Sequence, residues 1–409
     1  MIETKFKQTE IGPIPEDWEV SSLSDVGEIK MCKRILKFQT SNKGDIPFYK
    51  IGTFGKVADA YIPRELFEEY LQKYNYPKKG DILLSAAGTI GRTVVFDGKP
   101  SYFQDSNIVW INNDESLILN SLLYYIYDRV SWVTESGTIP RIYNGIVHSI
   151  KFAHPTSIVE QEKIAKALSD VDVLISDLDA LIAKKRDIKQ GAMQQLLTGK
   201  TRLGEYSESW KCKKIGEIGV TYSGLTGKTK EDFGGGNAKY VTFLNVLNNP
   251  ILNPSMFEEV VIKDGEHQNT CHKGDLFFNT SSETPEEVGV CSMLDEEVES
   301  LYLNSFCFGF RLTDPNIAPK YLAYYFRSNE GRKLMTVLAQ GVTRYNLSKS
   351  TFNNAQIMMP PSLAEQEEIA KFFESIDREI AAIELKKAKY ESIKQGMKQE
   401  LLTGKIRLV

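Results

Sequence analysis

Two stretches of the sequence combine basic side chains with aromatic and polar ones. Between residues 30 and 56 seven Lys or Arg residues stand against a single acid, and between residues 211 and 239 six Lys residues stand against three acids. Basic side chains contact phosphates, while amide, hydroxyl and guanidinium groups read base edges. Both stretches are therefore candidate DNA contacts, although a solvated protein surface can have the same composition.

Two further pairs of segments add polar and aromatic side chains at matching places. GTIPRIYN at 137–144 resembles GVTRYN at 341–346, and a loop follows each KGD sequence, at 79–81 and 273–275. The alternatives are core packing for the tyrosines and turn or cap roles for the amides. The candidate DNA contacts of the first half are Lys33, Arg34, Lys37, Lys50, Thr89, Arg92, Arg141, Tyr143 and Asn144. Those of the second half are Lys228, Lys230, Lys239, Asn279, Ser281, Ser282, Arg344, Tyr345 and Asn346.

No catalytic motif is complete in this sequence. Two TGK sequences could suggest a P-loop, but that motif would need glycine where Gln194 and Tyr222 stand. G-x-S-x-G and N-P-P-[YF] are absent, and Cys271, His272 and Cys291 lack the paired spacing of a metal site. We therefore expect a binding protein rather than an enzyme, with no catalytic residue, no metal and no cofactor.

The chain contains an internal repeat. Residues 155–203 and 360–408 align without a gap at an offset of 205 and share the blocks EQE, IAK, IKQG, LLTGK and RL in the same order. The preceding segments are related more weakly, through KGDILLS at 79–85 and KGDLFFN at 273–279. A tandem duplication of about 205 residues explains both similarities.

Each repeated segment is predicted to be one long helix. Ser157 and Ser362 stand at N-cap positions with Glu160 and Glu365 three residues later, which is the spacing of a capping box. Glycine follows the last apolar position of each segment, at positions 199 and 404, and is typical of a helix C-terminus. No proline interrupts the residues between these signals, so each helix should be about 60 Å long.

Apolar residues in these helices step by four and three, the spacing of a heptad seam. The seam favours packing of the two helices on each other, and the alternative is an amphipathic helix lying on its own domain. The expected seam residues are Ile164, Leu168, Val171, Ile175, Leu178, Ile182, Ile369, Phe373, Ile376, Ile380 and Ile383.

The rest of each half alternates short apolar runs, typical of strands, with helical patterns. The predicted fold class is α+β, with two α+β domains that are each followed by a long helix. The expected boundaries are 1–154 for the first domain, 155–203 for the first helix, 204–359 for the second domain and 360–409 for the second helix.

Composition excludes several classes of protein. The 409 residues are 42% hydrophobic and 25% charged, which is ordinary globular usage. Five cysteines without a C-x-x-C pair favour a reducing, cytoplasmic setting over a disulfide framework. No apolar run approaches the length of a membrane span, and the first ten residues lack the apolar core of a signal peptide.

Four features together resemble the specificity subunits of type I restriction-modification systems. They are TEIGPIPEDWEV at 9–20, KGDILLSAAGTIGR at 79–92, the P-x-x-x-x-EQE starts of the helices at 155 and 360, and their paired IKQG, LLTGK and RL ends. The resemblance covers the whole chain.

The resemblance implies a function for each part. Each globular domain would be a target recognition domain that reads one half of a bipartite, asymmetric double-stranded DNA sequence. The long helices would pack as an antiparallel coiled coil with a pseudo-two-fold repeat, set the spacing of the half-sites and dock two methyltransferase subunits. Those subunits would bind S-adenosylmethionine and methylate adenine, and restriction subunits with translocase and nuclease activity would join them.

A second interpretation is a coiled-coil scaffold that presents two α+β modules to proteins rather than to DNA. The net charge of −4 favours it, because nucleic-acid-binding domains are usually basic. The basic stretches are local, so under the first interpretation the chain should bind DNA weakly by itself and depend on partner subunits for most phosphate contacts.

Overall fold

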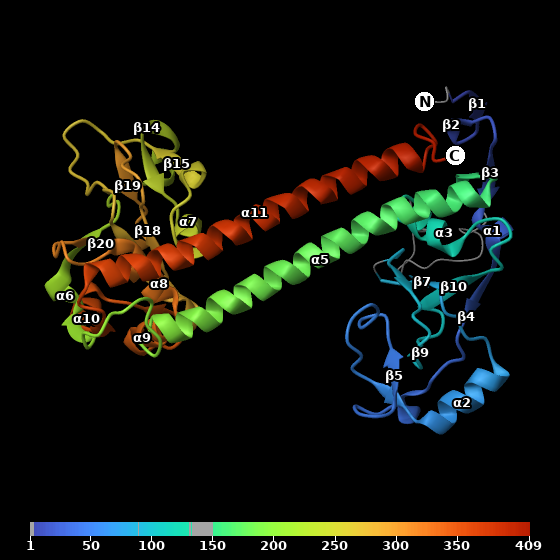
Figure 1. Cartoon of the computed structure of the whole chain (residues 1–409), viewed down its shortest axis with the longest axis horizontal. Coiled ribbons are helices and arrows are strands. Elements are labelled where there is room, and N and C mark those ends of the chain that lie inside the picture. The colour runs from blue at the N-terminus through green and yellow to red at the C-terminus, as the bar shows by residue number, and fades with distance from the viewer. Residues whose placement is uncertain (1–3, 89, 131, 133–149) are drawn as a thin grey trace. The chain divides into compact units, whose positions relative to one another are not determined.

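The computed structural model describes residues 4–88, 90–130, 132 and 150–409. The chain divides into two compact units. Unit 1 contains residues 1–178 and 386–409, and unit 2 contains residues 179–385, so both long helices contribute a segment to each unit (Figure 1). Among the described residues, no helix has the length and apolar character needed to cross a membrane.

The domain in unit 1 is built on an antiparallel four-stranded sheet and a smaller three-stranded sheet. The first has the order β4 (Gly27–Met31), β10 (Ile108–Asn113), β7 (Ile82–Ser85), β8 (Thr93–Val95), and the second has the order β6 (Tyr61–Ile62), β5 (Ile46–Tyr49), β9 (Tyr102–Phe103). Two-stranded pairs join β1 (Phe6–Thr9) to β2 (Gly12–Pro15) and β3 (Trp18–Ser22) to β11 (Lys151–Pro155). The described helices of this domain are α1 (Leu23–Val26), η1 (Lys37–Gln39), α2 (Arg64–Lys73) and α3 (Asn120–Tyr127).

The domain in unit 2 repeats this plan. Its four-stranded sheet has the order β13 (Gly219–Ser223), β20 (Cys307–Leu312), β16 (Leu276–Asn279), β18 (Cys291–Met293), and its three-stranded sheet has the order β15 (Phe257–Val260), β14 (Phe233–Val241), β19 (Leu301–Leu303). Two-stranded pairs join β12 (Lys211–Lys214) to β22 (Gln356–Met359) and β17 (Ser281–Ser282) to β21 (Tyr345–Asn346). Its helices are α6 (Ile215–Ile218), η2 (Lys230–Asp232), α7 (Phe243–Asn248), η3 (Pro254–Met256), η4 (Pro285–Glu287), α8 (Pro319–Arg327), α9 (Asn329–Leu338) and α10 (Lys349–Asn354).

The two domains share strand order and strand direction, including a parallel pair in each smaller sheet, β5 with β9 and β14 with β19. The KGD sequences explain part of this likeness. Gly80 and Gly274 have positive φ angles of 94° and 88°, and the side chains of Asp81 and Asp275 accept backbone N–H groups three residues earlier. Each KGD is therefore a tight turn that starts a fully buried central strand, β7 or β16.

The predicted long helices are α5 (Ile158–Leu196) and α11 (Leu363–Leu401), each of 39 residues and hence about 58 Å long. Their predicted caps are confirmed: the Ser157 and Ser362 hydroxyls accept the backbone N–H groups of Glu160 and Glu365 at 3.4 Å. Gly199 and Gly404 adopt left-handed conformations beyond the helix ends, with φ angles of 70° and 69°. The predicted fold class, two α+β domains each followed by a long helix that packs on the other, is thus confirmed.

The expected seam serves two purposes. Ile164 and Leu168 lie in the core of the first domain, and Ile369 and Phe373 lie in the core of the second. Further along, α5 and α11 pack on each other, and in unit 2 this contact is made by Ile182, Ile376, Ile380 and Ile383. Val171 and Ile175 are half-buried and Leu178 is buried. Each helix therefore lies on its own domain at its start and on the other helix further along, and its last turn joins the core of the other domain, so both interpretations of the seam hold in part.

Candidate nucleic-acid interface

An arginine near the C-terminus joins the end of α11 to the start of α5 in unit 1. Arg407 donates to both carboxylate oxygens of Glu160 at 2.6 and 2.7 Å and to those of Asp17 at 2.8 and 2.6 Å. The Trp18 indole donates to Glu160 at 3.4 Å, and Glu160 is fully buried. Hydrogen bonding from Arg407 lowers the pKa of Asp17, so this carboxylate is charged at neutral pH. We name Asp17, Trp18, Glu160 and Arg407 the clasp of unit 1.

Unit 2 contains a similar arrangement, in which the arginine and the glutamate recur at an offset of 205 residues and the tryptophan at an offset of 192. Arg202, from the turn after α5, pairs with the fully buried Glu365 at the start of α11, and the Trp210 indole donates to Glu365 at 3.4 Å. We name Arg202, Trp210 and Glu365 the clasp of unit 2. The sequence predicted a capping-box role for both glutamates, but their carboxylates bind arginine, because a buried charge needs a charged partner.

A second pair of equivalent contacts lies along the helices. In unit 1 the Tyr125 hydroxyl donates to Asp172 of α5 at 2.8 Å, and Lys394 of α11 forms an ion pair with the same carboxylate. In unit 2 the Tyr324 hydroxyl donates to Asp377 of α11 at 3.0 Å, and Lys189 of α5 pairs with it at 2.5 Å. Each contact joins a domain to both helices, so the helix segments hold the domain that they carry.

The EQE blocks also attach each domain to its helix. Gln161 accepts the backbone N–H of Leu119 at 2.9 Å and donates to the carbonyl of Leu117 at 3.0 Å. Gln366 accepts the backbone N–H of Ala318 at 2.8 Å and donates to a carbonyl of the same loop. The roles of the glutamines and of the clasps were not predicted from the sequence. The EQE and RL blocks are identical in both halves, and this was the available signal that the two blocks contact each other.

In the first domain, the candidate basic residues that the structure describes follow β4 and surround the smaller sheet. Lys33 lies 5.1 Å from the ring centroid of Tyr74, and the largely exposed Arg34 pairs with Asp105 at 2.8 Å. These four residues help to line a surface hollow of about 660 Å³. The hollow is therefore an electropositive surface feature, with a carboxylate that holds Arg34 in place.

The other candidates of the first domain differ in exposure and in the contacts that they make. Lys37 is exposed on η1, and Lys50 pairs with Asp59 at 2.8 Å. Arg92 donates to the carbonyl of Ile51 at 2.9 Å and lies over the ring of Phe54, so it also supports a loop. Thr89, Arg141, Tyr143 and Asn144 lie outside the described residues.

In the second domain, five candidates come together at one place. Ser281 and Ser282 form β17, which pairs with Asn346 and Tyr345 of β21. Arg344 donates to the hydroxyl of Ser281 at 3.1 Å. Segments at least 63 residues apart in the sequence thus form one polar surface with an exposed guanidinium. Lys230 and Lys239 are exposed elsewhere on the domain, on η2 and β14.

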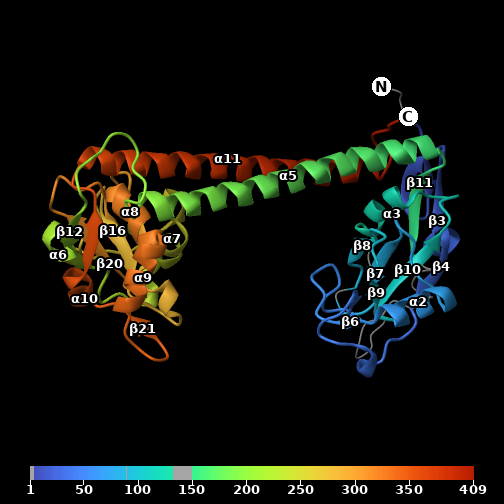
Figure 2. The same cartoon turned by 60° about the horizontal axis from the view of Figure 1, so that its bottom comes forward.

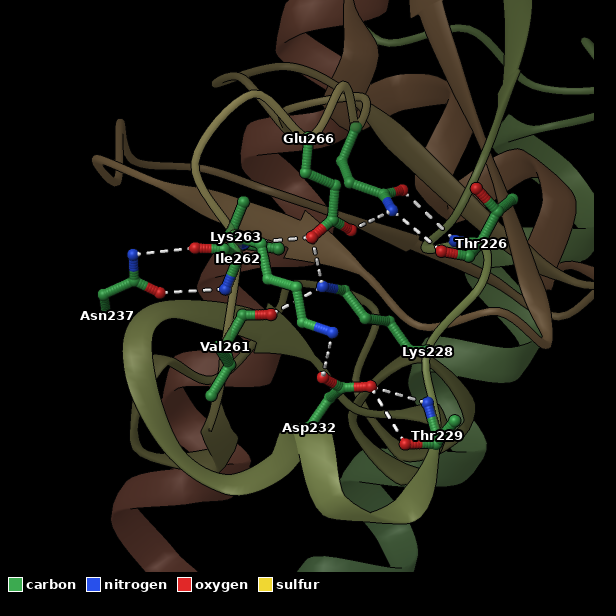
Figure 3. A network of polar contacts seen from close by, with 10 residues as sticks. Thr226, Lys228, Thr229, Asp232, Asn237, Val261, Ile262, Lys263 and Glu266 are labelled. Atoms are coloured by element: carbon green, nitrogen blue, oxygen red, sulfur yellow. Dashed lines mark hydrogen bonds and ion pairs between the residues drawn. The ribbon is translucent and has the colours of Figure 1, made fainter.

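Two candidates of the second domain belong to its internal structure. The Lys228 ammonium is almost fully buried and donates to Glu266 and to the carbonyl of Val261, both at 2.6 Å (Figure 3). Hydrogen bonding from Lys228 lowers the pKa of Glu266 to about 2. Asn279 is fully buried and binds the carbonyl of Glu287 and the backbone N–H of Val290. Both side chains hold loops together, so we leave them out of the DNA contacts proposed below.

Replacing Lys228 by Met should therefore destabilise the second domain without changing its interaction with phosphates. We expect its melting temperature to fall by a few degrees, because the Val261 carbonyl loses its partner, while the salt dependence of DNA binding by the assembled complex stays the same. Lys230→Met is the matched control, since Lys230 is exposed and should show the opposite pattern. A reduced salt dependence in the Lys228 variant would contradict this assignment.

The described residues hold no group of three His, Cys, Asp or Glu side chains that could bind a metal ion. Cys271 and Cys291 lie in separate core clusters, and burial raises the pKa of the Cys271 thiol to about 12. The structure therefore combines two similar α+β domains that differ in their exposed polar side chains with one pair of long helices.

The chain belongs to the family of type I restriction-modification DNA specificity subunits. The family described as "Type I restriction modification DNA specificity domain" matches residues 15–186 and 207–395. The chain is therefore the non-catalytic DNA specificity component of a type I restriction-modification complex.

Curated relatives agree with this assignment, and a solved structure shares the fold. A putative specificity subunit of Haemophilus influenzae is 58% identical over 166 residues, which are 40% of this chain and 43% of that protein. The putative MjaX specificity subunit of Methanocaldococcus jannaschii is 25% identical over 99% of this chain and 97% of its own length. The crystal structure of the S subunit from M. genitalium shares the fold, with a TM-score of 0.60, 15% identity and coverage of 98% of this chain and 99% of that one.

Proposed function

We propose that each globular domain reads one half of a bipartite, asymmetric sequence in double-stranded DNA. Residues 1–154 and 204–359 would be the two target recognition domains, and residues 155–203 and 360–409 would form the spacer between them. The observation that supports this proposal is that the two domains share one fold but differ in their exposed side chains. The clasps, the KGD turns and the sheet order recur in both halves, whereas the exposed polar and basic side chains differ.

We propose that the first domain contacts DNA through residues near the hollow after β4 and the loops of the smaller sheet. The described contacts would be Lys33, Arg34, Lys37, Lys50 and Arg92, and the sequence adds Thr89, Arg141, Tyr143 and Asn144. Lysines would contact phosphates, and the arginines, with their paired donors, suit guanine edges.

We propose that the second domain contacts DNA through the surface formed by β17 and β21 together with two exposed lysines. The residues would be Lys230, Lys239, Ser281, Ser282, Arg344, Tyr345 and Asn346. Hydroxyl, amide and guanidinium groups on two paired strands provide the mixture of donors and acceptors that base edges require.

The long helices would set the distance between the half-sites and dock two methyltransferase subunits, with restriction subunits joining that core. A net charge of −4 supports dependence on partners, because the chain alone lacks the positive charge that dominates DNA affinity. Adenine methylation and DNA cleavage would take place on those partners and not on this chain.

The test is methylome sequencing of the host with and without the gene for this chain. We expect a bipartite motif with one methylated adenine in each half to disappear on deletion and to return when the gene is restored. Persistence of every methylated motif after deletion would contradict the proposal and favour the protein-binding scaffold.

A further inference from the structure

Val342 is an exposed apolar side chain at the tip of a short loop in unit 2. Residues 340–346, which we name the tongue, end with the two residues of β21, and Figure 2 shows this loop extending from the body of the unit. The Val342 side chain is 89% exposed. Single exposed apolar residues are common on protein surfaces, so its exposure alone indicates no function.

The tongue is held by contacts on both sides. Gln340 and Asn346 exchange two backbone hydrogen bonds of 2.9 and 2.8 Å, and β21 pairs with β17. Gly341 closes the loop with a φ angle of 146°, and a Cβ atom at this position would lie 2.0 Å from the carbonyl oxygen of Arg344. A side chain at position 341 would therefore disrupt the loop, and the fold presents Val342 in a defined place.

The neighbours of Val342 are polar and exposed. Thr343, Arg344 and Asn346 all reach solvent from the tongue, and Arg344 is held by the Ser281 hydroxyl at 3.1 Å. The tongue thus places one apolar group among a hydroxyl, an amide and a guanidinium. The major groove of DNA presents the same mixture, since thymine is the base that offers an apolar methyl group beside hydrogen-bonding edges.

We propose that Val342 contacts the C5-methyl group of a thymine in the half-site read by the second domain, an inference that rests on the function proposed above. Valine has no hydrogen-bonding group, so it distinguishes a base only through apolar contact or through insertion between bases. Contact with a methyl group suits its short, branched side chain, whereas wedges that unstack bases are usually longer.

The experiment uses the intact methyltransferase complex that contains this chain, with duplexes carrying the motif found by methylome sequencing. Each thymine is replaced in turn by deoxyuridine, which removes only the methyl group. Every half-site offers a thymine, because its methylated adenine is paired with one. We expect one replacement to weaken binding by the wild-type complex about fourfold, which corresponds to the roughly 0.8 kcal/mol that burial of one methyl group contributes.

The same replacement should weaken binding by the Val342→Ala complex much less, because alanine lacks the two γ-methyl groups with which valine would reach the thymine methyl group. Val337→Ala is the matched control, since Val337 is an 80% exposed valine near the end of α9 in the same domain. This variant should keep the full sensitivity to deoxyuridine.

Three results would overturn the assignment of Val342. In the first, no deoxyuridine replacement weakens binding by the wild-type complex. In the second, deoxyuridine weakens binding by the Val342→Ala complex as much as by the wild-type complex, and in the third the Val337→Ala complex also loses its sensitivity to deoxyuridine. If Val342→Ala weakens binding to every duplex equally and the complex stays sensitive to deoxyuridine, Val342 inserts between bases instead. Failure of the wild-type complex to prefer the motif over a scrambled duplex would refute the proposed function itself, so the two failures are distinguishable.

Discussion

Glu160→Ala should destabilise unit 1 by about 2–3 kcal/mol, because the buried Trp18 indole loses its acceptor and Arg407 loses one of its two carboxylate partners. Glu160 is 1% exposed and holds Arg407 through two hydrogen bonds and the Trp18 indole through a third. The alanine variant leaves the Arg407 guanidinium with Asp17 as its remaining carboxylate partner. The start of α5 and the end of α11 should then separate more often.

Hydrogen exchange measures this effect directly, because it reports local opening for each segment of the chain. We expect amides of β3 and of the first turns of α5 to exchange much faster in the variant. Glu162→Ala is the matched control, since Glu162 is exposed on the same helix and its loss should change stability by less than about 0.5 kcal/mol. Equal exchange in the two variants would show that the clasp does not stabilise unit 1.

Lengthening both long helices by 21 residues should lengthen the DNA spacer by about nine base pairs. Three heptads add about 31.5 Å of helix, and B-DNA rises about 34 Å per turn. A heptad repeat drifts only about 20° against the helix, so three heptads turn the added segment by about 60°. Nine base pairs fall short of a full turn of B-DNA by a similar angle. The two domains would therefore still contact the same face of the DNA.

The insertions belong after Leu178 and after Leu385, where the segments of the two units meet. Methylome sequencing should then reveal the original half-sites at the longer spacing. An insertion in α5 alone is the control, because it places the Asp172–Lys394 and Asp377–Lys189 pairs out of register and should abolish methylation. Retention of the original spacing by the double insertion would refute the spacer role of the helices.

The long helices were predictable because their signals are local. Caps, a glycine stop and an uninterrupted apolar period determine a helix from its own residues, and α5 and α11 begin and end close to those signals. The duplication was visible for a similar reason, since KGD turns and EQE starts are short patterns that specify backbone geometry.

The clasps and the roles of single polar residues were not predictable, because they depend on contacts between distant parts of the chain. Arg407 and Glu160 are 247 positions apart, and a glutamate three residues after a serine has the same sequence pattern whether it caps a helix or binds arginine. Lys228 lies in a basic stretch, yet folding brings Glu266 to it and removes it from the surface. Ser281 and Arg344 come into contact only because β17 and β21 pair, and their neighbourhood was not visible in the sequence.

The position of the clasp has a consequence for an exchange of the first domain between related chains. All four residues of the clasp of unit 1 lie outside residues 19–154, so an exchange of that segment leaves the clasp intact. The side-chain hydrogen bonds of Gln161 go to main-chain atoms of Leu117, Leu119 and Pro155, and an incoming domain with the same backbone there satisfies them whatever its side chains are. An incoming segment therefore has to supply a side-chain partner for Asp172 in place of Tyr125, whereas the clasp and the Gln161 contacts need no compensating substitution.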